Sequence, residues 1–329
     1  MKHQRRQKQG RSGRIVAFGV VIIAAAAIAG GVILHNRSSD PVRPLPVQLP
    51  AATGAYLGVY THGVPDSYAG ITAFQNATGT RPDVVMYYSG WFVPFPTAFA
   101  TTAANDGAVP LVQMDPDNIG PNKISLARIA AGRYDGYLSQ YAEAVRHYRH
   151  PVIMSFGHEM NGTWYPWGYG QTSPVVFKAA WRHIVNLFRY LGVKNVTWLW
   201  TVNIINNAHG HAIPSPARWW PGASYVNWVG IDGYYLKPTW KFAPLFGPTI
   251  AAVQKLTPDP ILIAETGVVP AAGQPAKIAD LFAGVHQYGL LGFVWFDATA
   301  QSRLQFGITS PAALAAFRKA ATSYKRPGS

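Results

Sequence analysis

The chain has no cysteine and few acidic residues, with 14 Asp and Glu among its 329 residues. The lack of cysteine excludes a disulfide framework and a thiolate metal site. A chain of this length buries enough apolar surface to fold without covalent cross-links, so the absence fits a protein inside or outside the cell. Because carboxylates are scarce, an acidic side chain that ends an apolar run is an informative feature.

The formal charge of +14 is concentrated near the N-terminus. Residues 1–52 contain eight Lys and Arg against one acid, Asp40. In the rest of the chain no Lys/Arg run is longer than Arg318-Lys319 or Lys325-Arg326. Proteins that bind nucleic acid present a clustered basic face to the phosphates. We therefore expect no nucleic-acid partner.

The N-terminal segment has the pattern of a membrane anchor. Residues 1–14 are basic, and residues 15–34 carry no charge and are largely apolar, which is the length that spans a bilayer as a helix. The positive-inside rule then predicts a cytoplasmic tail (1–14), a single transmembrane helix (15–34), a proline-rich linker (35–52) and a domain outside the cell. The alternative is a cleaved signal sequence, because Ala27-Ile28-Ala29 fits a cleavage site, although the apolar run continues to Leu34. Both alternatives export the domain.

From residue 53 to 325 the chain alternates apolar runs that end in polar residues with helical stretches. The expected strands are 56–60, 84–88, 109–113, 152–156, 196–201, 228–232, 261–264 and 292–296, and the clearest helices are 137–148, 175–191, 250–256, 275–288 and 312–324. This pattern predicts an α/β fold, the (β/α)₈ TIM barrel, with a doubly wound open sheet as the alternative. Polar residues follow strand after strand, which favours the barrel, because an open sheet gathers them at one switch point.

Two glutamates end apolar runs, Glu159 after the fourth expected strand and Glu265 at the seventh. A pair of carboxyl groups at the mouth of one barrel is the catalytic arrangement that most glycoside hydrolases use. Two carboxyl groups about 5–5.5 Å apart cleave with retention of the anomeric configuration, and groups about 6.5–9.5 Å apart cleave with inversion. The sequence alone does not give this distance. Other side chains near strand ends are candidates for binding sugar hydroxyls or stacking on sugar rings; they are Asn161, Trp164, Trp167, Asn203, Asp232 and Trp295.

Residues 156–168 (FGHEMNGTWYPWG) resemble the acid/base region of glycoside hydrolase family 26, the β-mannanase family. Residues 129–135, 228–234 and 263–267 resemble further segments of that family, and the resemblance covers roughly 55–324. It implies a retaining (β/α)₈ enzyme with Glu159 as acid/base and Glu265 as nucleophile. It also implies that His158 holds the nucleophile and the sugar, and that Tyr234 contacts Glu265. Many family mannanases have arginine where this chain has Ser155, which weakens the transfer of substrate identity.

The combined expectation is an exported, membrane-tethered retaining endo-β-glycanase, acting on β-1,4-mannan. The alternatives are mixed-linkage β-1,3-1,4-glucan or xylan as substrate, or a non-catalytic glycan-binding barrel on the same fold. We expect a monomer that needs no cofactor and no metal. The pair His209 and His211, with His62, has metal-ligand spacing, but no acid lies near it in sequence, and we interpret it as a polar loop.

Overall fold

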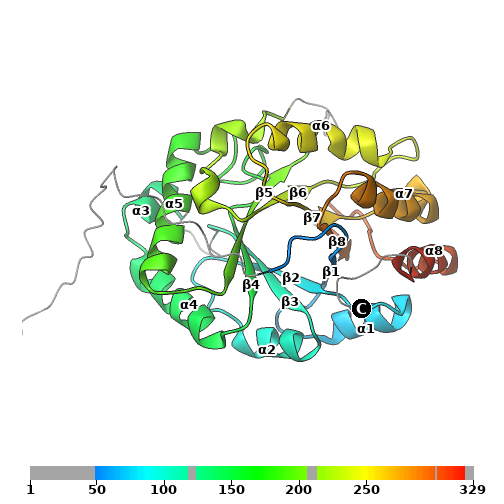
Figure 1. The fold of residues 1–329 in the computed structure, drawn as a ribbon, viewed down its shortest axis with the longest axis horizontal. Coiled ribbons are helices and arrows are strands. Elements are labelled where there is room, and N and C mark those ends of the chain that lie inside the picture. Colours follow the sequence, from blue (N-terminus) through cyan, green and yellow to red (C-terminus); the bar gives the residue numbers. More distant parts are fainter. Residues whose placement is uncertain (1–48, 118–123, 206–212, 301, 323–329) are drawn as a thin grey trace, which may run out of the picture. The chain divides into compact units, whose positions relative to one another are not determined.

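A closed barrel of eight parallel strands forms the centre of the protein, seen in the computed structural model, which describes residues 49–117, 124–205, 213–300 and 302–322 (Figure 1). The strands are β1 Tyr56–Thr61, β2 Val84–Ser89, β3 Val109–Met114, β4 Val152–Phe156, β5 Val196–Asn203, β6 Trp228–Asp232, β7 Ile261–Thr266 and β8 Gly292–Asp297. Each strand pairs with its sequence neighbour, and β8 pairs with β1. The predicted (β/α)₈ barrel is confirmed.

Helices surround the barrel on its outside (Figure 1). They are α1 Ala69–Thr78, α2 Thr97–Asn105, α3 Leu126–Ala130, α4 Asp135–Tyr148, α5 Pro174–Tyr190, α6 Phe242–Gln254, α7 Gln274–Gln287 and α8 Pro311–Thr322, with short 3₁₀ turns at Pro216–Trp219, Ala223–Tyr225 and Pro270–Ala272. Helix α5 shows why the boundaries fall where they do: the Ser173 hydroxyl accepts the Val176 N–H, and Pro174 occupies the first turn.

Helix α6 begins eight residues before the expected start at 250. It contains Pro248 in its interior, a residue that normally ends or kinks a helix. The helix persists because its buried side chains recur at helical spacing, and this apolar face packs against the barrel. The buried side chains of this face are Phe242, Leu245, Phe246, Thr249, Ile250 and Val253.

Two layers of core follow from the alternation of side chains along each strand. Inward residues fill the barrel, among them Met86, Leu111, Ile153 and Leu262, while the opposite faces pack against the helices. Near the C-terminal end of the barrel the inward positions become polar, with Gln113, Ser155, Thr201 and Asp232 all buried. The barrel is therefore a packed interior with a polar layer beneath its mouth.

The expected cytoplasmic tail, transmembrane helix and nearly all of the linker lie outside the described residues. Within the described ranges, no helix is both long and apolar enough to cross a bilayer.

A glycine in helix α7 gives a test of the outer packing. Alanine usually stabilises a helix by about 1 kcal/mol relative to glycine, but a Cβ at Gly284 would lie 2.1 Å from Cγ of the buried Phe242. We expect Gly284→Ala to lower the free energy of unfolding by about 1–2 kcal/mol, because overpacking outweighs the helix propensity. Gly136→Ala in α4, where nothing lies within 4 Å, is the matched control and should not destabilise. Denaturant unfolding of both variants measures the difference.

Candidate active site

Glu159 and Glu265 line one cavity of about 770 Å³ at the C-terminal mouth of the barrel. Glu159 follows β4, and Glu265 lies near the end of β7. The cavity wall is rich in aromatic rings, including Tyr60, Tyr88, Trp164, Tyr165, Trp167, Tyr234, Trp240, Phe296 and Phe306. A cavity of this size lined by aromatic side chains with a few polar groups is suited to a carbohydrate or another small ligand.

A bulge in β7 directs Glu265 into the mouth. Between β6 and β7 the pairing steps from Ile231 with Ile263 to Asp232 with Glu265, so β7 contains one extra residue. With strict alternation Glu265 would share the outward face of Ile263, which packs in the layer against the helices. The extra residue gives Glu265 the inward orientation of Asp232, as bulges near active sites commonly do.

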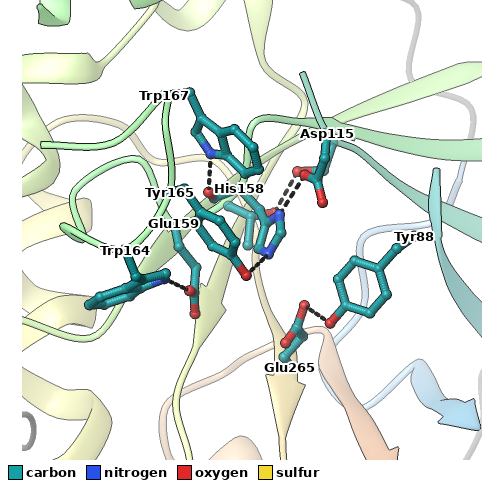
Figure 2. Close-up of polar contacts among 10 residues, drawn as sticks. Tyr88, Asp115, His158, Glu159, Trp164, Tyr165, Trp167 and Glu265 are labelled. Carbon is teal, nitrogen blue, oxygen red and sulfur yellow. Dashed lines mark hydrogen bonds and ion pairs between the residues drawn. The ribbon is translucent and has the colours of Figure 1, made fainter. Parts of the chain in front are cut away.

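Two phenols hold the Glu265 carboxylate. The Tyr88 hydroxyl donates to Oε1 at 2.6 Å, and the Tyr234 hydroxyl donates to Oε2 at 2.7 Å (Figure 2 shows Tyr88). Burial, with the charge of Glu265, raises the pKa of both tyrosines well above the usual value, so both remain donors. Short O–H donors to both oxygens suit an ionised carboxylate.

Glu159 occupies a strained, partly desolvated position. Its φ is 54°, in the left-handed region that a non-glycine residue rarely adopts. Asn203 Nδ2 donates to its Oε1, and Trp164 Nε1 donates to its Oε2, both at 2.6 Å. Burial, helped by the charge of Glu265, raises the pKa of Glu159 to about 7, against the opposing effects of His158 and the two donors. Near neutral pH this carboxyl therefore holds a proton in a substantial part of the molecules.

His158 lies between these acids and a third one, Asp115, which follows β3 (Figure 2). Its Nδ1 is 2.8 Å from Asp115 Oδ1, and its Nε2 is 3.0 Å from the Tyr165 hydroxyl. Burial alone lowers the pKa of His158, but the charge and hydrogen bond of Asp115, with the charges of Glu265 and Glu159, raise it to about 9. The site therefore contains an imidazolium fixed by a partly buried carboxylate.

Asp232 lies beneath the cavity and is fully buried. Neither of its carboxyl oxygens has a hydrogen-bond partner among the described residues. Burial, with the charges of Glu265, Glu159 and Asp115, raises its pKa well above the usual value, so its surroundings favour the protonated carboxyl group.

One group of potential metal ligands comes together in the described part of the chain, with atoms of His158, Asp232 and Glu265 within 4.8 Å of one another. Both nitrogens of His158 and both carboxylate oxygens of Glu265 already have the partners described above, which makes this group a poor cation site. The expected polar loop with His209 and His211 lies outside the described residues. That no metal is needed remains a prediction.

Six of the ten residues expected to catalyse or to bind the substrate line the cavity: Glu159, Trp164, Trp167, Asn203, Tyr234 and Glu265. The lining does not include His158, Asn161, Asp232 or Trp295. Asn161 is fully buried and exchanges two hydrogen bonds with the backbone of Asn203, so its amide joins the loop after β4 to the end of β5. Its position gives no support for the expected contact with a sugar hydroxyl.

Trp295 is fully buried between the barrel and α8, where its Nε1 donates to the Phe306 carbonyl and its ring meets Phe317. The expected stacking of Trp295 on a sugar therefore has no geometric basis. Alternation along β8 puts the next residue, Phe296, toward the cavity instead, where it stacks on Tyr60.

Three further residues, to which the sequence pattern assigned no role, complete the polar network: Tyr88, Asp115 and Tyr165. Tyr88 and Asp115 occupy the ends of β2 and β3, and this position at the barrel mouth was the available signal. Tyr165 lies inside the characteristic 156–168 run, and it stacks on Trp167 with ring centroids 4.4 Å apart. Their partners depend on which strand ends meet in space, which the chain order alone does not specify.

A family model and several known proteins match this chain. The family model for glycosyl hydrolase family 26 matches residues 59–272. Endoglucanase H of Acetivibrio thermocellus is 29% identical over 284 residues, covering 82% of this chain and 30% of that protein. The β-1,3-xylanase TXYA of a Vibrio species is 25% identical over 170 residues, 49% of this chain and 35% of the relative. The chain thus spans about a third of the length of these curated relatives.

Solved structures show the same fold. A modular endo-β-1,4-mannanase from Cellulomonas fimi has a TM-score of 0.63 at 18% identity, covering 85% of this chain and 76% of that one. The Bacillus subtilis mannanase BCman has a TM-score of 0.60 at 18% identity, covering 84% of this chain and 93% of that one.

Proposed function

Because the chain belongs to glycosyl hydrolase family 26, we propose that it is a retaining endo-β-glycanase with Glu265 as nucleophile and Glu159 as acid/base. The observation that carries this proposal is the contrast between the two carboxyl groups in one cavity. Glu159 has a raised pKa, whereas Glu265 accepts hydrogen bonds from two phenols. A pair of acids whose surroundings favour opposite protonation states is what double displacement requires.

In the first step, Glu265 attacks the anomeric carbon while Glu159 gives its proton to the departing glycosidic oxygen. The resulting ester removes the negative charge of Glu265. Because that charge is one of the causes that raise the pKa of Glu159, the pKa of Glu159 falls at this stage. Glu159 is then suited to take a proton from the water that hydrolyses the ester. The two steps regenerate both carboxyl groups.

The surrounding side chains position these two acids. Tyr88 and Tyr234 fix the orientation of Glu265 through its two oxygens. Trp164 and Asn203 do the same for Glu159, and the half-exposed ring of Trp164 offers a stacking surface at the edge of the cavity.

β-1,4-Mannan is the substrate that we propose, with mixed-linkage β-glucan or xylan as the alternative. Structural neighbours named mannanases support the first, and relatives named endoglucanase and β-1,3-xylanase support the second. Ser155, where many family mannanases have arginine, is buried and hydrogen-bonded to Thr201 at 2.9 Å. Reducing-sugar release from mannan, lichenan, β-1,3-xylan and β-1,4-xylan by the purified protein decides between them. Binding without release from any of these glycans would favour a non-catalytic barrel.

We also propose that residues 15–34 tether the domain to the outer face of the cell membrane as a single-pass anchor. The apolar length and the basic residues before it support this arrangement. The full chain should sediment with membranes and resist an alkaline carbonate wash. Recovery of the mature protein from the medium, beginning near Gly30, would instead establish signal cleavage.

The pH dependence tests the coupling among Asp115, His158 and Glu159. Glu159 must be protonated to act as acid, so kcat on polysaccharide should fall as the pH rises above about 7. Asp115 raises the pKa of His158, and the charge of His158 lowers that of Glu159. In Asp115→Asn, we therefore expect the alkaline limb to move to higher pH, with a lower maximum rate. If kcat fell while the alkaline limb of its pH profile stayed at the wild-type pH, Asp115 would act only through packing and not through the pKa of Glu159.

A further inference from the structure

Three aromatic side chains form a partly exposed surface beside the cavity, here called the aromatic ledge: Phe92, Tyr134 and Tyr137. Phe92 is 51% exposed, the most exposed phenylalanine among the large apolar residues that the structure leaves open to solvent. Its ring meets Tyr134 and Tyr137 edge-on, with centroids 5.9 and 5.4 Å apart. The two tyrosines are half-buried at the start of α4.

The backbone around Phe92 is strained and firmly held. Phe92 has a φ of 70°, in the left-handed region that disfavours side chains with a Cβ. The preceding residue, Trp91, is buried against Tyr137 and Phe156, and the Tyr137 hydroxyl donates to the Val93 carbonyl at 3.0 Å. Glycine or asparagine would satisfy this backbone at lower cost. The backbone conformation thus gives no reason for a phenylalanine at this position.

The loop after β2 links the ledge to the wall of the cavity. Tyr88, four residues before Phe92, lines the cavity and holds Glu265. Asp117 also lines it, and the Asp117 carbonyl accepts the Trp91 N–H at 2.7 Å. The loop that carries Phe92 is therefore fixed at one end by a residue of the catalytic cavity and along its length by another.

We propose that the aromatic ledge is a distal subsite for a β-linked glycan chain, in which Phe92 stacks on a pyranose ring beyond the cleavage point. The C–H face of a pyranose is apolar and can stack on an aromatic ring that a rigid loop keeps exposed to solvent. A linear polysaccharide that passes over Glu159 and Glu265 leaves the cavity past Asp117 and reaches the ledge. This inference rests on the proposed function and adds a specific contact to it.

The test is a length series of oligosaccharides from whichever polysaccharide the wild-type protein cleaves, measured beside an aryl disaccharide glycoside too short to reach the ledge. Phe92→Asn removes the ring and tolerates the left-handed backbone. It should reduce kcat/KM for the longest chains about three- to tenfold relative to the aryl disaccharide, the effect of losing one aromatic stacking contact. Phe92→Tyr keeps the ring and should restore the chain-length dependence. Tyr190→Ala removes an aromatic side chain that is 67% exposed at the end of α5 and should leave the dependence unchanged.

Equal rates for Phe92→Asn and wild type at every chain length would overturn the ledge as a subsite, and so would a loss of the same size on the short glycoside. A change in oligomeric state without a change in chain-length dependence would identify the ledge as a self-association surface and would likewise overturn the proposal. Failure of the proposed function is distinguishable, because the wild-type protein would then release no sugar from any of the glycans.

Discussion

Glu265→Ala is expected to lower kcat on polysaccharide by about 10⁴-fold or more, the scale of losing a catalytic nucleophile. The alanine side chain has no atom that can bond to the anomeric carbon, so no glycosyl-enzyme forms. The loss should be as large for aryl glycosides as for polysaccharide, because every substrate needs the nucleophile. Steady-state kinetics on both kinds of substrate measure it.

Two further variants separate chemistry from folding. Removal of the carboxylate leaves the hydroxyls of Tyr88 and Tyr234 without their partner, which costs stability. Glu265→Gln keeps an acceptor in place and should be equally inactive while it unfolds close to the wild type. Glu143→Ala removes an exposed carboxylate on α4 and should retain full activity. Substantial turnover by Glu265→Gln would move the nucleophile to another residue.

Glu159→Ala is expected to show a loss that depends on the leaving group. When a polysaccharide is cleaved, the leaving group is a sugar alkoxide, which departs poorly unless Glu159 protonates it. The kcat on polysaccharide should therefore fall by about 10²–10⁴-fold. An aryl glycoside with an acidic phenol leaves without that proton, so the first step should be nearly unaffected. Hydrolysis of the glycosyl-enzyme still needs a base, and a burst of phenol before a slow steady state should appear.

Rapid-mixing measurement of phenol release provides the check. Losses of equal size on polysaccharide and on the activated glycoside would contradict the assignment of Glu159. Trp164→Phe is the matched control, because it removes one hydrogen bond to Glu159 while keeping the carboxyl group. Its expected effect is smaller, and it should not produce a burst.

The sequence predicted the barrel and the pair of glutamates because both depend on patterns that are local in the chain. Buried parallel strands read as apolar runs, and a strand-end acid stands out where acids are rare. Trp295 shows the limit of this approach. Trp295 and Phe296 are adjacent aromatic residues at the end of β8, and only the register of the barrel decides that Phe296 meets the cavity.

The network behind Glu159 was less accessible to sequence reasoning for a different reason. Asp115 and His158 are 43 residues apart, and their contact depends on the pairing of β3 with β4. The start of α6 was predicted eight residues too late, and the helix in fact continues through Pro248, where tertiary packing of its apolar face keeps it intact.

The extra residue in β7 has a consequence for transplanting this chemistry. If the two glutamates and their tyrosines were copied onto an idealised barrel, the side chains of the seventh strand would alternate strictly between its two faces. The residue equivalent to Glu265 would then point toward the surrounding helices and away from the cavity. Every chemical group would be present and the catalyst would be inert. The irregular spacing has to be copied together with the side chains, because it decides which face of the strand carries that carboxylate.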